Sequence, residues 1–355
     1  MRARTASEQR PRAALSARRG TPAALIASAS VLCLLAACSG GGGTRHTSTS
    51  PSESSASSST AAASAQPGPL HATDAGWRLP APLSRPAVAI AGDRVFLLGG
   101  LAPGDVSTAR VVSVDPTTGH SALAGALAVA VHDAAGAAVG GVPTVFGGGA
   151  ARTIDAVQGF QSNAGHVVGH LPDPRSDLAA ASIGGTAYVV GGFDGAALTP
   201  DVLATTDGSH FRTVGRLAQG VRYAAVAPVG HSLWVIGGQT GTAESATGTE
   251  VDLIQRLDTE TGAATVVGHL PHRLAHAMAF VLGGQLYLAG GRTAGGPLTD
   301  VLAISPGGAA TAAGTLPGPR ADAGVAVLGD TAWLLGGETT GPLAALASVV
   351  TVSRA

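Results

Sequence analysis

The feature that most constrains this chain is an internal repeat built around paired glycines. A short apolar run that ends in Gly-Gly occurs six times, at 95–100, 143–148, 187–192, 233–238, 286–291 and 332–337. The first glycines of successive copies lie 48, 44, 46, 53 and 46 residues apart, whereas another glycine precedes each of them by a constant seven residues. A fixed offset inside copies of varying length marks a rigid unit, so the sequence predicts a repeat architecture.

Each copy predicts a meander of four antiparallel strands. An apolar strand such as 179–183 reaches a two-residue glycine turn, and the run that ends in Gly-Gly follows as the second strand. A variable loop then leads to a third strand, a turn such as Asp115-Pro-Thr-Thr-Gly119, and a fourth strand that ends in Gly-x-Leu. The last copy lacks its fourth strand. We expect the upstream segment 74–80, which ends like a fourth strand, to pair with 348–353 and so leave no long exposed edge.

This order of strands, Gly-Gly and Asp-x-x-Thr-Gly turn resembles the kelch repeat, and the resemblance covers residues 71–355. It implies an all-β, six-bladed kelch-type β-propeller whose last blade is closed by the N-terminal strand at about 74–80. The match is less complete in the second copy, where Thr144 stands at a position that is aromatic in the other five. The tryptophan usual in the family's fourth strand is also mostly absent.

The N-terminal region predicts export and anchoring. Residues 1–37 join an arginine-rich start to a short apolar run, the pattern of a secretory signal. Leu35-Ala36-Ala37-Cys38 resembles the bacterial lipobox, which implies that Cys38 carries a lipid. Residues 38–70 are rich in Ser, Gly, Thr and Ala and cannot bury enough apolar surface to fold, so we interpret them as a disordered tether. We therefore expect an exported protein that is anchored to the outer face of the bacterial cytoplasmic membrane or to the cell surface.

Charge and cysteine usage exclude several functions. The net charge of −1 includes six arginines and one glutamate within 1–37, so the remainder holds 15 basic and 21 acidic residues. Such a balance, without a basic run, argues against nucleic-acid binding. Both cysteines, Cys33 and Cys38, lie near the N-terminus, which excludes a disulfide framework or a cysteine-based metal centre in 71–355. We expect a monomer without cofactor or metal.

Candidate binding residues gather on one predicted face. In a meander, the loops before the first strand and after the second strand emerge on the same side, and this side carries Arg85, Asp133, Arg175, Asp177, Arg222, His276, Arg320 and Asp322. We predict a ligand-binding face formed by Arg175, Asp177, Arg222, His276, Arg320 and Asp322, because arginine offers a bidentate fork to carboxylates and sugars. The same charges recur at related repeat positions, so salt bridges between neighbouring repeats are the alternative interpretation.

Two functions follow from this pattern. The main prediction is a non-enzymatic, surface-tethered module that binds a protein or glycan, with no catalytic residue assigned. The alternative, suggested by the kelch-type resemblance, is a mutarotase or epimerase for a sialic-acid-like sugar, in which Arg175 or Arg320 would act with His276 or Asp177. The copper chemistry of kelch-type galactose oxidases requires a Tyr–Cys crosslink, and residues 71–355 contain no cysteine. His269, His272 and His276 straddle a strand end, a loop and a strand start, which argues against a metal site.

Overall fold

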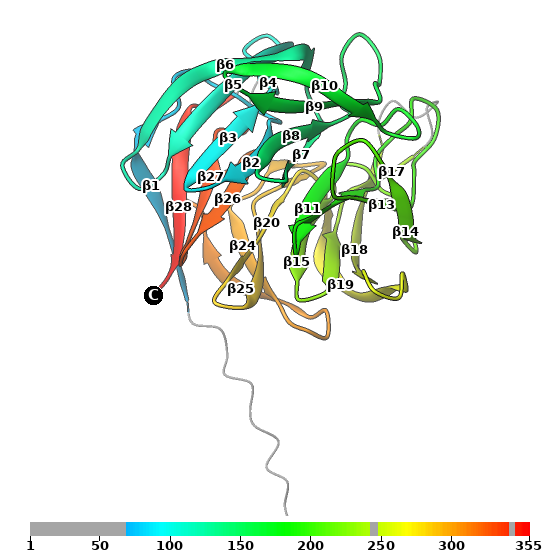
Figure 1. Ribbon diagram of the computed structural model, residues 1–355. Coiled ribbons are helices and arrows are strands. Elements are labelled where there is room, and N and C mark those ends of the chain that lie inside the picture. Colours follow the sequence, from blue (N-terminus) through cyan, green and yellow to red (C-terminus); the bar gives the residue numbers. More distant parts are fainter. Residues whose placement is uncertain (1–68, 242–247, 341–344) are drawn as a thin grey trace, which may run out of the picture. The chain divides into compact units, whose positions relative to one another are not determined.

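All regular structure in the described part of the chain is β-strand. The computed structural model describes residues 69–241, 248–340 and 345–355 (Figure 1). The prediction of an all-β fold is confirmed. Within these ranges no helix has the length and apolar character needed to cross a membrane. The expected signal segment, Cys38 and the tether up to residue 68 lie outside the described residues.

The first half of the described chain forms three antiparallel meanders, numbered here in chain order. Meander 1 contains β2 (Ala87–Ala91), β3 (Arg94–Leu98), β5 (Val106–Asp115) and β6 (His120–Val131), with β4 (Leu101–Ala102) paired to β5. Meander 2 contains β7 (Ala135–Val139), β8 (Val142–Phe146), β9 (Ala156–Gln161) and β10 (Ala164–His170). Meander 3 contains β11 (Ala179–Ile183), β12 (Thr186–Val190), β13 (Asp201–Thr205) and β14 (Arg212–Arg216). A parallel contact between β6 and β10 joins the first two into one larger sheet.

Three further meanders complete the described fold. Meander 4 contains β15 (Ala225–Val229), β16 (Ser232–Ile236), β18 (Thr249–Asp258) and β19 (Ala264–Leu274), with β17 (Gln239–Thr240) paired to β18. Meander 5 contains β20 (Met278–Leu282), β21 (Gln285–Ala289), β24 (Asp300–Ile304) and β25 (Ala310–Thr315), and carries the small hairpin β22 (Arg292–Thr293) and β23 (Gly296–Pro297). Meander 6 contains β26 (Gly324–Leu328), β27 (Thr331–Leu335) and β28 (Ser348–Arg354), and its outer strand is β1 (Leu70–Arg78).

The N-terminal strand closes meander 6, as the sequence predicts. In Figure 1, β1 in blue lies beside β28 in red, and the two pair antiparallel from Leu70 opposite Arg354 to Asp74 opposite Val350. A bulge follows before Arg78, where Gly76 has a φ of 76°. The observed strand starts and ends earlier than the predicted segment 74–80, because pairing already begins at Leu70.

The diglycines join consecutive meanders. The N–H of the second glycine donates to a backbone carbonyl of the next meander, for example from Gly148 to Arg175 over 2.7 Å. The same bond runs from Gly337 in meander 6 back to Leu83 ahead of meander 1, over 2.9 Å. The first glycine has a positive φ in every copy, and a Cβ there would collide with the same carbonyl oxygen. The fixed diglycine of the repeat is therefore a requirement of this seam.

Six residues accept the seam bonds, one ahead of each first strand. We call this the seam position, nine residues before each turn glycine; it comprises Leu83, Val131, Arg175, Val221, Leu274 and Arg320. All six side chains are buried. Hydrophobic clusters fill the interfaces between successive meanders, including the one between meander 6 and meander 1, where Trp333 and Leu335 lie in the same cluster as Val95 and Leu97.

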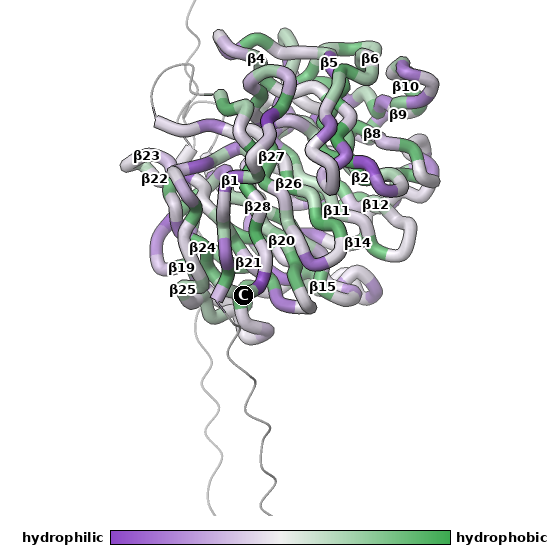
Figure 2. The backbone as a smooth tube through the Cα atoms, turned by 90° about the vertical axis from the view of Figure 1, so that its left-hand side faces the viewer, coloured by the Kyte–Doolittle hydropathy of each residue, from purple (hydrophilic) through white to green (hydrophobic). Residues whose placement is uncertain are grey.

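The first strands of the six meanders surround a central channel. Each of β2, β7, β11, β15, β20 and β26 contacts two of the others, which makes a closed cycle. Along these strands positions directed into the core alternate with channel-facing positions. The channel-facing positions are Val88, Ile90, Gly136, Ala138, Ala180, Ser182, Val226, Pro228, Ala279, Val281, Val325 and Val327. Figure 2 shows β20 and β26 mainly in the green and white of apolar residues. Ser182 is the one polar side chain among these twelve positions.

Candidate functional site

Six residues at equivalent repeat positions surround one mouth of the channel. Each lies seven residues before a turn glycine and two residues before a first strand. We call them the ring: Arg85, Asp133, Asp177, Tyr223, His276 and Asp322. They line a polar neck of about 150 Å³. The structure therefore brings side chains from all six meanders together at this mouth.

The backbone holds the ring in a strained conformation. Amide N–H groups donate to the carbonyl of the preceding ring residue over 2.8–3.0 Å in five of the six neighbouring pairs, including the closing pair from Arg85 to Asp322. All six residues have a positive φ, between 49° and 61°. This conformation is uncommon for residues other than glycine and concentrates at functional sites. These backbone hydrogen bonds fix the Cα positions of the ring residues, whatever side chain each residue carries.

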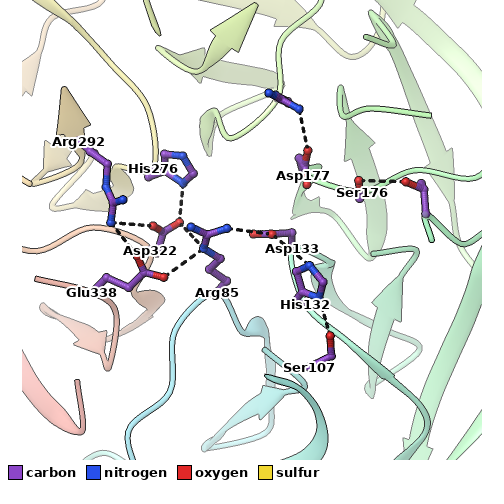
Figure 3. A network of polar contacts seen from close by, with 12 residues as sticks. Arg85, Ser107, His132, Asp133, Ser176, Asp177, His276, Arg292, Asp322 and Glu338 are labelled. Carbon is purple, nitrogen blue, oxygen red and sulfur yellow. Dashed lines mark hydrogen bonds and ion pairs between the residues drawn. The ribbon is translucent and has the colours of Figure 1, made fainter. Parts of the chain in front are cut away.

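Side-chain contacts follow the same circle and leave one break. Arg85 contacts Asp133 at 3.2 Å and Asp322 at 3.7 Å, as Figure 3 shows. His276 Nδ1 lies 2.6 Å from Asp322 Oδ1, and the rings of His276 and Tyr223 stack with centroids 4.1 Å apart. The neighbours Asp133 and Asp177 contact different cations, Arg85 at 3.2 Å and Arg222 at 3.6 Å, and no cation of the ring lies between them. The break is thus the one neighbouring pair in the ring that consists of two acids.

The electrostatics of the break favour protonation. Burial raises the pKa of Asp133 to about 6, although Arg85 opposes the shift. Burial also raises the pKa of Asp177 to about 6, and the charge of Asp133 adds to the effect. Burial and these two carboxylates raise the pKa of Tyr223 far above its ordinary value, so its hydroxyl stays protonated. A group with a pKa near 6 can give or take a proton close to neutral pH.

On the opposite side of the ring, the surroundings favour the charged form of the carboxyl group. Burial alone would raise the pKa of Asp322, but His276 and Arg85 outweigh it and hold the pKa below its ordinary value. Asp322 is therefore a carboxylate that accepts the Nδ1–H of His276. In the neutral imidazole this leaves Nε2 as the proton acceptor, and the carboxylate fixes both tautomer and orientation. The ring combines a histidine base with two carboxyl groups of raised pKa.

An outer layer of charges supports the ring from the loops after the diglycines. Glu338 bridges two guanidinium groups, with Oε1 at 3.2 Å from Arg85 and Oε2 at 2.6 Å from Arg292 (Figure 3). These residues border a second hollow of about 380 Å³. Arg222 lies 3.6 Å from Asp177, with its guanidinium over the rings of Phe193 and Tyr223. Ion pairs between meanders, the alternative interpretation from the sequence, are thus present around the ring.

Four of the six predicted binding residues lie at this mouth and two do not. Asp177, His276 and Asp322 belong to the ring, and Arg222 contacts it. Arg175 and Arg320 occupy the seam position and are only 1% and 4% exposed. Arg175 donates to the carbonyl of Asp201 over 3.0 Å, and Arg320 donates to Ser348 Oγ over 2.8 Å. Their side chains are engaged inside the meanders.

The neighbouring histidines have separate partners. His269 lies 3.3 Å from Asp252, and His272 lies 4.0 Å from Asp300, both on outer parts of the structure. Across the described ranges no three His, Cys, Asp or Glu side chains are grouped as a metal site. Another histidine, His132, lies just outside the ring, where Ser107 Oγ approaches its Nδ1 at 2.8 Å. Burial and Arg85 lower the pKa of His132.

Counting seven residues back from each turn glycine would have identified the ring from the sequence. Tyr223 is the ring residue of meander 4, one position after the predicted Arg222, and it lies seven residues before Gly230 like its five counterparts. The same count assigns Arg175 to a position that is Leu or Val in four other copies and therefore buried. Arg292 and Glu338 follow their diglycines directly, which is the sequence signal for the outer layer.

Comparison with known proteins supports the fold. No protein-family model and no curated protein matches the sequence. Among solved structures, that of YjhT is similar, with a TM-score of 0.65 and 19% sequence identity over 78% of this chain and 99% of that chain. At this identity the likeness concerns the fold alone. Together with the closed cycle of first strands, it supports a β-propeller.

Proposed function

We propose that the six meanders are the blades of a six-bladed kelch-type β-propeller and that its ring interconverts the anomers of a carboxylated, sialic-acid-like sugar. The closed seam from Gly337 to Leu83 and the clusters between meanders support the blade assignment. The single observation that carries the activity is the neck itself, where the His276–Asp322 pair faces the same small space as Asp133 and Asp177. The likeness to YjhT supports the propeller fold on which this proposal rests.

Mutarotation needs two coordinated proton transfers, and the ring offers a group for each. One group removes the proton of the anomeric hydroxyl while another protonates the ring oxygen, so that the C–O bond breaks and a carbonyl forms. Rotation and the reverse transfers close the ring on the other face, with no net consumption of protons. In our proposal His276 Nε2 is the base, and Asp133 or Asp177, with a pKa of about 6, is the acid.

The sugar would lie on the loop side of the neck. A space of 150 Å³ holds a reacting end rather than a whole sugar, whereas the hollow beside Arg292 and Glu338 adds about 380 Å³. Arg292 is the guanidinium assigned to the sugar carboxylate, because its side chain is 32% exposed and already holds the carboxylate of Glu338. A ligand carboxylate would compete with Glu338 for the same donors.

The test is anomeric exchange of sialic acid, followed by NMR. We expect the protein to accelerate the exchange and His276→Ala to reduce the acceleration at least a hundredfold, the usual contribution of a positioned acid or base. His269→Ala is the matched control, because this exposed histidine lies on β19 and pairs only with Asp252. Exchange at the uncatalysed rate, or an unaffected His276→Ala variant, would sink the proposal.

A binding module is the second candidate. It is favoured because the arginines of the outer layer are already paired with carboxylates. Arg85 contacts three carboxylates, and Arg292 contacts two, so the outer layer is a fixed charged surface as it stands. A glycan array and a protein pull-down distinguish the two functions. Saturable binding that survives His276→Ala and occurs without anomeric exchange would establish the binding module and exclude the mutarotase.

The cellular location of the protein is part of the proposal. We propose that Cys38 carries a lipid and that residues 38–70 tether the folded domain outside the cytoplasmic membrane, where it acts as a monomer and binds no nucleic acid. The motif ahead of Cys38 and the composition of the tether support this assignment. Cys38→Ser should release the protein into the medium or leave it unprocessed. Normal cleavage and continued membrane association of this variant would contradict the lipid anchor.

A further inference from the structure

The central channel is an apolar cavity, which goes beyond the proposed sugar chemistry. It has a volume of about 780 Å³, within the range of ligand-binding cavities. Eleven of its twelve channel-facing positions are aliphatic residues, glycine or proline. Small side chains such as Ala180, Ala279 and Val325 leave it wide. The aliphatic side chains among them offer water no hydrogen bond, so displacement of water from these side chains by an apolar group is favourable.

The polar neck opens directly into this channel. The residues that follow the ring, among them Ala134, Leu178 and Ala277, line both the neck and the channel. The two cavities therefore form one passage with a narrow polar end and a long apolar body. Five-residue strands at ~3.3 Å per residue make a wall of roughly 17 Å, about the length of an extended chain of fourteen carbons.

The neck is acidic. Three carboxylates line it, those of Asp133, Asp177 and Asp322, against the single guanidinium of Arg85. Asp322 Oδ2 is buried and accepts no hydrogen bond, although Arg292 Nη2 lies 3.9 Å from it. Asp133 accepts from Arg85, and Arg222 lies 3.6 Å from Asp177, but no cation of the ring lies between these two carboxylates. A cationic group with several N–H bonds complements all three carboxylates, whereas an anionic group would add to their repulsion.

We infer that the channel binds an aliphatic amphiphile with an ammonium head group, its chain lying along the apolar walls and its nitrogen between Asp133 and Asp177. The ammonium donates to these two carboxylates, the one pair of neighbouring acids in the ring. The chain displaces water from the channel-facing positions. This ligand reaches the ring from the channel side, whereas the proposed sugar approaches from the loops.

Calorimetry of the full chain tests the inference with four probes below their micelle concentrations: n-decylamine, n-decanol, decanoate and n-butylamine. Each buried methylene strengthens binding about fourfold, so decylamine should bind more than a hundredfold tighter than butylamine. It should bind with one-to-one stoichiometry and at least tenfold tighter than decanol or decanoate. Equal binding of decylamine and butylamine would overturn the channel assignment, and equal binding of decylamine and decanoate would overturn the head-group assignment.

Two pairs of substitutions locate the bound amphiphile. Val226→Thr with Val325→Thr keeps the volume of the channel wall but makes it polar, and should weaken decylamine binding at least fivefold. Val266→Thr on the outer strand β19, at a side chain 42% exposed, is the control and should change nothing. Asp133→Asn with Asp177→Asn should reduce the affinity for decylamine to that for decanol.

The outcome is independent of the mutarotase test. Non-saturable decylamine binding that neither double variant changes would show general attraction to an acidic protein and overturn the inference. If a double variant fails to fold, the chain-length and head-group series on the natural protein still decides. Failure of sialic acid exchange leaves these binding results unaffected, because no probe contains a sugar.

Discussion

The seam position and the ring position lie two residues apart in every repeat, yet they are used in opposite ways. At the seam position the side chain is buried and the backbone oxygen accepts the N–H of a diglycine. At the ring position backbone hydrogen bonds join five of the six neighbouring pairs, and the side chain lines the channel mouth. Assembly of the domain thus depends on the first position, and the chemistry of the mouth on the second.

The two positions also differ in how much side-chain variety they accept. The seam position holds Leu, Val or Arg, and its two arginines bury their guanidinium groups against carbonyls of their own meander. The ring position holds Arg, Asp, Tyr and His in the same backbone conformation. Because the ring is built by backbone bonds, its side chains are free to differ between meanders. Variation at a fixed, strained position is what a functional site on a repeat scaffold requires.

The largest expected loss of stability follows from replacing the first glycine of a diglycine. Gly290→Ala places a methyl group against the carbonyl oxygen of Arg320 in a backbone with a φ of 57°, so we expect destabilisation of about 3–5 kcal/mol or failure to fold. Gly284→Ala is the control, because this turn glycine also has a positive φ but has open space around it. Its cost should be about 1 kcal/mol. Thermal unfolding measures both, and equal costs would refute the seam as the critical contact.

The next-largest expected effect distinguishes a residue at the seam position, which supports stability, from one at the ring position, which supports anomeric exchange. Arg175→Ala leaves the carbonyls of Gly191 and Asp201 without their donor and opens a cavity, so we expect a loss of about 2–4 kcal/mol. Arg175→Leu should cost less, since leucine occupies the same position at Leu83 and Leu274. Neither variant should change anomeric exchange per folded molecule. His276→Ala should reduce exchange at least a hundredfold, and it should also lose stability because it leaves the buried carboxylate of Asp322 without its imidazole partner. Reduced exchange per folded molecule in Arg175→Ala, or unchanged exchange in His276→Ala, would contradict the separation.

The repeat made the architecture predictable, because its rules are local. Strands, glycine turns and diglycines recur with constant offsets, and the pairing of 74–80 with 348–353 followed from counting strands in the last copy. The start of β1 at Leu70 was not predictable, since the pairing of 70–73 depends on the partner strand rather than on a pattern of its own. The positions of the strands needed no knowledge of distant contacts.

The ring was only partly predictable, because its membership depends on exact register. Charge alone grouped Arg175 with Asp177, whereas the structure separates them by burial. An arginine at a position otherwise occupied by leucine or valine is a structural residue, and the aligned repeats contain that information. The contact of Glu338 with Arg292 joins two different meanders over 2.6 Å, and no spacing within one repeat could have indicated it.

The smallest expected effect tests the break in the ring. Asp133 is a carboxyl group whose burial raises its pKa to about 6, so at neutral pH folding holds it in a charged form that its surroundings disfavour. Asp133→Asn removes that charge and keeps the shape. We therefore expect the variant to be more stable than the natural protein at pH 7, by about 1–3 kcal/mol, since one pKa unit corresponds to roughly 1.4 kcal/mol. Chemical denaturation at fixed pH measures the difference.

The pH dependence of that difference decides its cause. Because the pKa of Asp133 is higher in the folded chain than its ordinary value of 3.8, its favourable contribution is complete below about pH 4 and is lost as the pH rises through 6. The advantage of Asp133→Asn should thus vanish near pH 4 and be complete above pH 7. Asp322→Asn is the opposite case: a lowered pKa means that its carboxylate stabilises the fold above pH 4, so this variant should lose stability at pH 7. If Asp133→Asn instead destabilises at pH 7, the ion pair with Arg85 outweighs burial, and Asp133 is a structural partner of Arg85 rather than the proton donor of the ring.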